Sequence, residues 1–167
     1  MREWVPVPSS ARGRLAAEAL AAFGKHGYDG VAVGRLARAA GVTTGSLYHH
    51  FGSKLGLYAV VREEVERRVL DRMEGAIAAV GPAEPGAAQA ALLVGFDYVT
   101  SHQFTRLLAE PDPGSGADPV ETLLVRLEED PRGRLLAAAW RAALAAAAGG
   151  TARSLCRSAL ADIARPR

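Results

Sequence analysis

Apolar residues recur at three- and four-residue spacings along most of this chain, which is typical of helices that bury one face. Glycine and proline stand between these segments, where they end helices or form turns. No stretch shows the sustained alternation of apolar and polar residues that indicates a half-buried strand. The sequence therefore predicts an all-α fold of about nine helices. The clearest of them span residues 11–25, 33–40, 44–50, 54–80, 87–108, 119–129, 131–149 and 151–165.

Side chains that suit helix N-caps precede several of these segments. A hydroxyl or carboxylate there accepts a hydrogen bond from a backbone N–H that has no partner in the first helical turn. The proline of Asp118-Pro119 also suits the first position of a helix. The predicted N-caps are Ser9 or Ser10, Thr43 or Thr44, Ser53, Asp118 and Thr151.

Two short helices, over 33–40 and 44–50, are separated by a tight turn and predict a helix-turn-helix. Ala37 is small where the first helix meets the second, Gly41 suits the turn, and Leu47 anchors the second helix in the core. Polar residues remain on the outer side of the second helix, and a DNA major groove about 12 Å wide admits one helix. These outer residues are Thr43, Thr44, Gly45, Ser46, Tyr48 and His49.

The distribution of charge supports a DNA partner. The whole chain has a formal net charge of +2, but residues 1–58 hold seven Lys or Arg and three Asp or Glu. That part is therefore at +4 and the remainder at −2. A basic segment is where a polyanion binds. An asymmetry of this size also arises by chance, so it adds to the helix-turn-helix pattern and does not stand alone.

Two stretches of sequence carry a resemblance to a known family. Residues 12–28 read RGRLAAEALAAFGKHGY and residues 36–54 read LARAAGVTTGSLYHHFGSK. They closely resemble the N-terminal DNA-binding domain of TetR-family transcriptional regulators, and GSLYHHFGSK is the most specific part. The resemblance implies that residues 45–50 lie in the recognition helix. It also implies that Tyr48 and His49 contact phosphates, that Lys54 holds the DNA backbone, and that Thr43 and Thr44 touch phosphates or base edges.

Three residues depart from the family pattern. Ala32 stands where a Ser or Thr cap is usual, and a missing cap costs a helix about 1 kcal/mol. Arg35 stands where the family often has an acid. Thr44 stands where the family often has Lys or Arg, and this replacement removes one phosphate contact and lowers the dependence of DNA affinity on salt.

Each candidate DNA contact also has an ordinary structural interpretation. Tyr48 would then be a core residue, and His49 and His50 would be solvated surface side chains. Lys54 would be a charged residue at a helix start, although a cation is mildly unfavourable there unless an anion meets it.

The resemblance divides the chain into a DNA-binding domain, residues 1–55, and a helical regulatory and dimerisation domain, residues 56–167. Two apolar stripes in the C-terminal part are candidates for a four-helix interface between two copies. A homodimer also follows from the mechanism, since one helix-turn-helix covers one half of a palindrome. Alternatively, both stripes serve the core of a single chain. The stripes are Leu136, Trp140, Ala143, Leu144 and Ala147, and Leu155, Ala159, Leu160 and Ile163.

An aromatic cluster in the segment 87–108 is the candidate site for a small-molecule effector, whose identity the sequence leaves open. An apolar cavity with a few polar groups is the usual form of such a site, and the resemblance implies that its ligand changes the spacing of the two DNA-reading parts. The other interpretation of this cluster is plain core. Its residues are Phe96, Tyr98, Val99, His102 and Phe104.

Other classes of function find little support. The sequence has no catalytic cluster, metal-ligand set or cofactor-binding fingerprint, and Cys156 is its one cysteine. No apolar run is long enough for a bilayer, and no signal peptide is evident. We therefore expect a cytoplasmic, ligand-responsive DNA-binding regulator, more often a repressor in this family. The alternative is a small-molecule-binding helical dimer with a vestigial DNA-binding part, and Ala32 and Thr44 are the residues that favour it.

Overall fold

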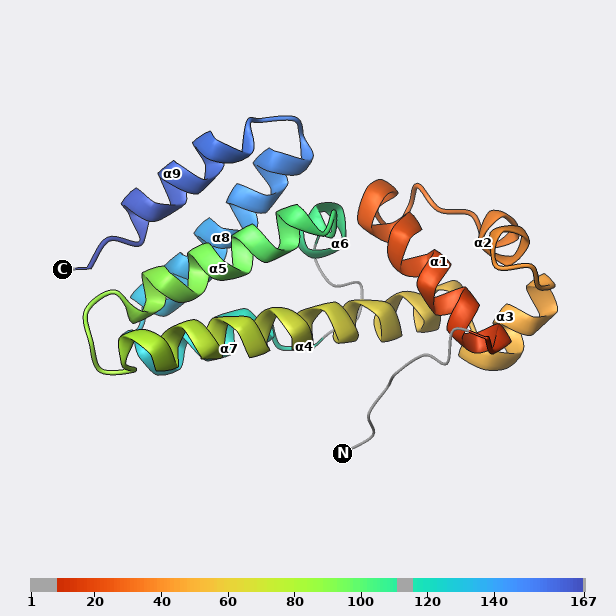
Figure 1. Cartoon of the computed structure of the whole chain (residues 1–167), viewed down its shortest axis with the longest axis horizontal. Helices are drawn as coiled ribbons and strands as arrows, with labels where there is room; N and C mark the ends of the chain where they lie inside the picture. The colour runs from red at the N-terminus through yellow and green to blue at the C-terminus, as the bar shows by residue number, and fades with distance from the viewer. Residues whose placement is uncertain (1–8, 111–115, 167) are drawn as a thin grey trace.

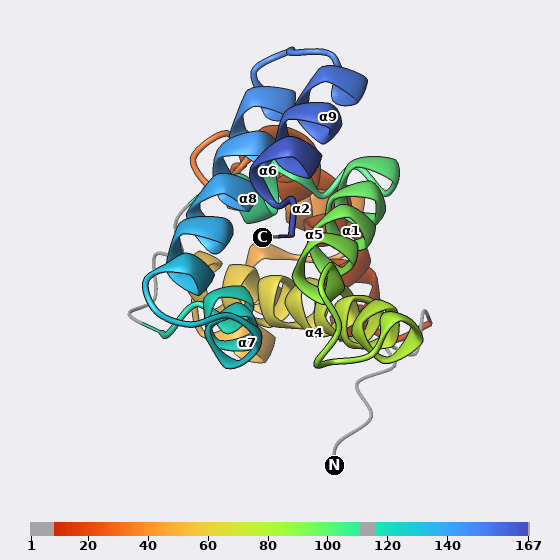
Figure 2. The same cartoon turned by 90° about the vertical axis from the view of Figure 1, so that its left-hand side faces the viewer.

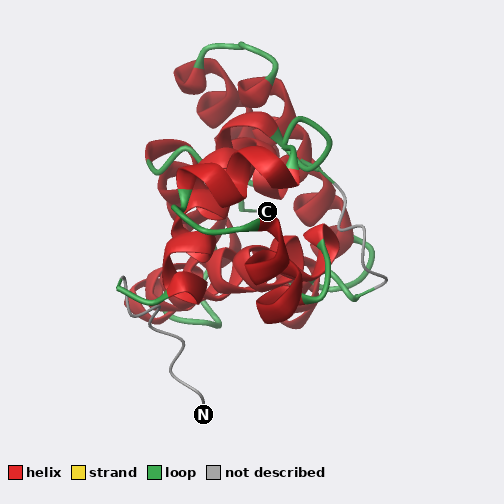
Figure 3. Ribbon diagram, turned by 90° about the vertical axis from the view of Figure 1, so that its right-hand side faces the viewer, coloured by secondary structure: helices red, strands yellow, loops and turns green. Residues whose placement is uncertain are grey.

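The computed structural model describes residues 9–110 and 116–166, and all regular secondary structure within them is helical (Figures 1 and 3). The fold class predicted from the sequence is confirmed. The helices are α1 (Ala11–His26), α2 (Val33–Ala39), α3 (Thr44–Phe51), α4 (Lys54–Val80), α5 (Ala87–Ser101), α6 (Thr105–Ala109), α7 (Pro119–Leu127), α8 (Arg132–Ala148) and α9 (Arg153–Ile163).

Helix α4 runs along the long axis of the molecule and organises the rest (Figure 1). Helices α1 to α3 gather around its N-terminal end, and α5 returns beside it after the turn that follows Val80. Helix α8 packs against α6, α7 and α9, and α9 also contacts α5 (Figure 2). We call residues 9–61 the head, and residues 62–110 and 116–166 the body.

Most of the predicted N-caps are confirmed. Gly13 donates its backbone N–H to the Ser10 hydroxyl at 2.9 Å, and Ser46 donates to the Thr43 hydroxyl at 3.1 Å. Ser53 caps α4 in the same way, and Asp118 accepts from the first turn of α7 with Pro119 at its start. These bonds satisfy N–H groups that the helices cannot satisfy themselves, so local sequence sets these four helix starts.

The helical period that the sequence shows over 87–108 is divided in the structure into α5 and α6. Gln103 adopts a positive φ of 61°, and Phe104 donates its N–H back to the Val99 carbonyl at 3.0 Å. This is the left-handed C-terminal closure normally made by glycine or asparagine. No glycine or proline stands at this position, and the apolar spacing continues through it. The sequence pattern therefore does not indicate the break.

The predicted N-cap at Thr151 is wrong. Thr151 donates its backbone N–H to the Ala146 carbonyl at 3.0 Å, after Gly150 with φ of 101°. Thr151 therefore completes the end of α8. Helix α9 instead begins after Ala152, whose side chain makes no capping bond.

One hydrophobic core joins head and body. The inward face of α4 is buried, with Leu57, Val65, Val69 and Met73 each 0% exposed. Phe23 of α1 packs edge-on against Tyr58 of α4, with ring centroids 5.0 Å apart. The head therefore rests on α4 through apolar contacts. Within the described residues, no helix is long and apolar enough to cross a membrane.

Candidate nucleic-acid interface

The helix-turn-helix forms as the sequence indicates. Gly41 takes a positive φ of 64° directly after α2, and Val42 donates its N–H to the Ala37 carbonyl at 2.9 Å. Ala37 and Leu47 are 2% and 0% exposed, so they fix α3 against α2 and the core. The side of α3 opposite Leu47 is left facing outward.

That outer face of α3 is polar and accessible. Thr44, Gly45, His49 and His50 are exposed, and the Tyr48 side chain is 51% exposed, so the interpretation of Tyr48 as a core residue is wrong. Ser46 is half-buried, and Thr43 is exposed although its hydroxyl caps the helix. The face carries hydroxyls, imidazoles and a phenol, which are the groups that bond phosphates and base edges.

Lys54 lies at the first position of α4, directly after α3. Its Nζ is 4.1 Å from the centroid of the Tyr28 ring, and the residue is half-buried. A lysine over an aromatic face is held by the negative charge of that face while its ammonium stays partly hydrated. The Tyr28 ring thus holds the Lys54 ammonium at the N-terminus of α4, beside the end of α3.

The cations of the head lack acidic partners within the described residues, since every ion pair found there lies in the body. Arg14 and Arg35 donate to backbone carbonyls, of Ala40 and Gly30, and so hold turns in place. Arg12 lies beside α3, with its guanidinium carbon 5.6 Å from the Phe51 ring centroid. Sequence reasoning missed Arg12 as a candidate contact, although it opens the stretch that carries the family resemblance.

Comparison with known proteins gives matches over the region that contains the helix-turn-helix. Residues 15–61 match the family model described as bacterial regulatory proteins, tetR family. The HTH-type transcriptional repressor AcnR of Corynebacterium glutamicum is 39% identical over 61 residues, and AcnR of Corynebacterium efficiens is equally similar. Over residues 15–61, the chain is therefore similar to the DNA-binding part of TetR-family regulators.

The similarity to these curated relatives is confined to that part. The match covers 36% of this chain and 32% of each relative, so the chain spans about a third of the length of the curated relatives it matches. Both relatives are named as HTH-type transcriptional repressors.

Solved structures extend the likeness to the whole fold. A TetR-family regulator from Shewanella sp. PV-4 superposes with a TM-score of 0.68 at 18% identity, over 93% of this chain and 96% of that one. The TetR-family regulator PfmR of Thermus thermophilus has a TM-score of 0.59 at 22% identity, over 95% of this chain and 98% of that one. At these identities the likeness shows the fold.

The aromatic cluster of the body is mostly filled core. Phe96 and Val99 are 0% exposed, so no water-sized space touches either side chain. Tyr98 and Phe104 are buried as well, while His102 is exposed and its ring lies 4.3 Å from that of Tyr98. In this structure Phe96 and Val99 pack the core and line no cavity. An effector site at this cluster therefore stays a prediction.

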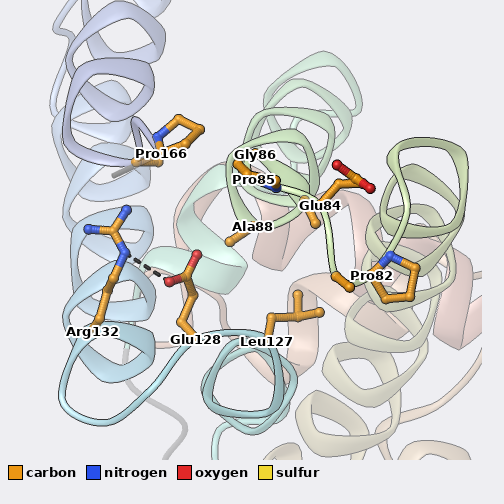
Figure 4. Close-up of a pocket in the computed structure, with 12 residues that line it drawn as sticks. Pro82, Glu84, Pro85, Gly86, Ala88, Leu127, Glu128, Arg132 and Pro166 are labelled. Carbon is orange, nitrogen blue, oxygen red and sulfur yellow. Dashed lines mark hydrogen bonds and ion pairs between the residues drawn. The ribbon is translucent and has the colours of Figure 1, made fainter.

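A cavity of about 280 Å³ lies elsewhere, beside the turn between α4 and α5 (Figure 4). Figure 1 shows this turn at the end of α4 opposite the head. The turn between α4 and α5, the end of α7 and residues 164–166 surround it. Glu128 and Arg132 line it and form an ion pair of 2.9 Å, and Pro82, Pro85 and Pro166 contribute apolar surface. From the sequence alone, the turn between α4 and α5 is predicted only as a break between two helices.

The predicted dimer stripes fall into two groups. Leu136, Trp140, Leu144 and Leu160 are at most 2% exposed and belong to the core of the single chain. Ala143 and Ala147 are half-buried, Ala159 is exposed, and Leu155 and Ile163 are 64% and 58% exposed. Leu135 is 65% exposed and was missed, although it stands next to the predicted stripe.

A buried polar network fills the contact between α4, α6 and α8. Arg62 is 3% exposed; its Nε pairs with Glu66 at 3.0 Å, and Glu66 also faces Arg141 at 3.7 Å. Burial raises the pKa of Glu66 above its usual range, although Arg62 and Arg141 oppose the shift. Burial would also raise the pKa of Asp118, but the Arg141 hydrogen bonds and charge hold it below its usual range.

Proposed function

We propose that this chain is a DNA-binding transcriptional regulator that binds palindromic operator DNA as a homodimer and acts as a repressor. The observation that carries the proposal is the exposed polar face of α3 within the TetR-family segment, flanked by head cations without acidic partners among the described residues. In this mechanism α3 enters the major groove. The contacts are made by Thr43, Thr44, Gly45, Ser46, Tyr48, His49 and Lys54, joined by Arg12.

The roles within that set follow from position and chemistry. Tyr48, His49, Lys54 and Arg12 hold phosphates, which contributes affinity for any DNA sequence. Thr44 and Ser46, on the first turn of α3, reach base edges and contribute sequence preference. Residues 1–55 act as the DNA-binding domain in this proposal, and residues 56–167 as the regulatory and dimerisation domain that binds a small-molecule effector.

The dimer interface of the proposal uses the outer side of α8 and α9. Leu135, Leu155 and Ile163 expose large apolar side chains there, and the intervening exposed alanines Ala138 and Ala159 permit close approach of helices. A second copy is the proposed occupant, because a palindrome requires two heads related by a twofold axis. Replacing Leu155 and Ile163 with serine tests this, and the double variant should sediment as a monomer.

Binding to the DNA that flanks the coding region, followed by fluorescence anisotropy, tests the function. Affinity should fall steeply between about 50 and about 200 mM salt, because phosphate contacts release counterions. Lys54→Ala should weaken binding to all sequences and reduce the salt slope by about one unit. Arg126→Ala removes the same charge from an exposed position in the body and is the matched control. Unchanged binding by Lys54→Ala, or no binding by the wild type at low salt, would overturn the proposal.

Thr44→Ala and Ser46→Ala should instead change the preferred half-site, which selection from a randomised DNA pool would measure. The vestigial alternative gains no support from Ala32, since α2 forms without a side-chain cap and with backbone bonds from Arg35 and Leu36 to the Ala32 carbonyl.

A further inference from the structure

Glu110, just after α6, reaches from the body to the head. Its Oε2 accepts a hydrogen bond from the backbone N–H of Tyr28 at 3.0 Å, across 82 positions of sequence. The carboxylate lies against Gly27, in the space that a Cβ on that residue would occupy. Gly27 is buried and has a φ of 70°, so both its conformation and its close contact with the carboxylate require glycine.

The backbone of Glu110 is held from the other side by α4. The buried Arg62 donates from Nη1 to the Glu110 carbonyl at 2.9 Å and to the Leu107 carbonyl at 2.7 Å. The Tyr58 hydroxyl donates to the same Leu107 carbonyl at 3.2 Å. Glu110 is therefore tied to α4 through its carbonyl and to the turn after α1 through its side chain.

This link fixes the head at a point away from α3. The turn that contains Gly27 and Tyr28 ends α1, and α1 also crosses the body closely at Gly24, where a Cβ would lie 2.5 Å from the Gln103 carbonyl oxygen. Hydrogen bonds to a carboxylate are about twice as strong as neutral ones and are directional. Rotation of the head on α4 must break this bond or move α6 with it.

We propose that Glu110 is a positioning residue that sets the orientation of the head, and through it the half-site spacing that the dimer accepts. The inference rests on the proposed function, because spacing matters only to a dimer on a palindrome. Half-site spacing follows from where the two recognition helices point, and one base pair of insertion both moves and rotates a half-site. A head without this link adapts to several spacings and discriminates less between them.

Operators with identical half-sites and spacers changed by one or two base pairs test the proposal. The wild type should prefer one spacing by about tenfold or more, and Glu110→Ala should reduce that preference to about threefold or less. Binding to a single half-site should stay within about twofold for both, because α3 is untouched. Glu110→Gln keeps an oxygen that accepts from Tyr28 and should restore most of the preference. Asp29→Ala removes the same charge from an exposed position in the same turn and should leave it intact.

Amide hydrogen exchange of residues 27–31 gives a readout that needs no DNA. Exchange at Tyr28 should speed up in Glu110→Ala and not in Asp29→Ala; equal exchange would refute the link itself. If the wild type binds no DNA while exchange responds as expected, the proposed function fails and the positioning role with it, although the contact is real. If the wild type binds and Glu110→Ala keeps the full spacing preference, only the positioning role is overturned.

Discussion

The described arginines of the body bond to acids or to backbone carbonyls, whereas several cations of the head face solvent without an acidic partner among the described residues. Arg62 and Arg141 are largely buried and each makes several bonds, while Arg12 and Arg38 are exposed. Paired cations hold a fold together, and unpaired ones cost little stability and remain available to a polyanion. The same residue type thus serves stability in one region and, in the proposed function, DNA binding in the other.

Removing a buried arginine of the body should have the largest effect on the free energy of unfolding. Arg62→Ala leaves the Leu107 and Glu110 carbonyls and the Glu66 carboxylate short of a buried partner. We expect a loss of about 3–5 kcal/mol in the free energy of unfolding, which urea titration measures. Arg38→Ala in the head is the control and should change it by at most about 0.5 kcal/mol. Similar losses for both variants would remove the distinction.

Two helical glycines of the head sharpen the comparison, because Gly24 lies against the body and Gly34 does not. In Gly24→Ala the new Cβ would lie 2.5 Å from the Gln103 carbonyl oxygen, so we expect a loss of about 1–3 kcal/mol by thermal or urea unfolding. Gly34→Ala in α2 has nothing within 4 Å of its Cβ and should gain about 0.5–1 kcal/mol. A neutral Gly24→Ala would show that the contact yields easily.

The smallest effect is a pH dependence in the buried network. Because the pKa of Glu66 is raised in the folded state, folding takes up a proton between the unfolded value near 4.5 and the folded value. The Glu66 contribution to stability is therefore greatest below that window and is lost as pH rises through it. The free energy of unfolding of the wild type, relative to Glu66→Gln, should fall as pH increases. Asp118, whose pKa is lowered, should give the opposite sign on the acid side. A flat difference for Glu66→Gln would show that its carboxylate titrates normally.

Local sequence patterns were sufficient to predict the helix starts and turns of the head. The caps at Ser10, Thr43 and Ser53, the turn at Gly41 and the buried Leu47 all depend on residues within about one or two helical turns, so spacing alone predicts them. The residues of α3 that we propose to face DNA are then those left on its outer side. For this part of the chain, the interpretation needed no knowledge of how distant segments pack.

The body depended on contacts that spacing does not contain. The helical period predicted an apolar stripe that includes Leu136. The packing of the helices then decided that Leu136 lies in the core and that Leu135 beside it is exposed. The helix break at Gln103 contains no glycine or proline that would indicate it in the sequence. It lies where Gly24 of α1 closely approaches the Gln103 backbone.

Helix content, the proposed recognition helix and the basic character of the head follow from the amino-acid sequence, because capping, periodicity and charge are properties of nearby residues. Which apolar stripe is core, where the cavity lies and how the head is held on α4 were decided by tertiary structure. The bond between Glu110 and Tyr28 joins residues 82 positions apart, and a contact of that kind exists only once the helices have packed.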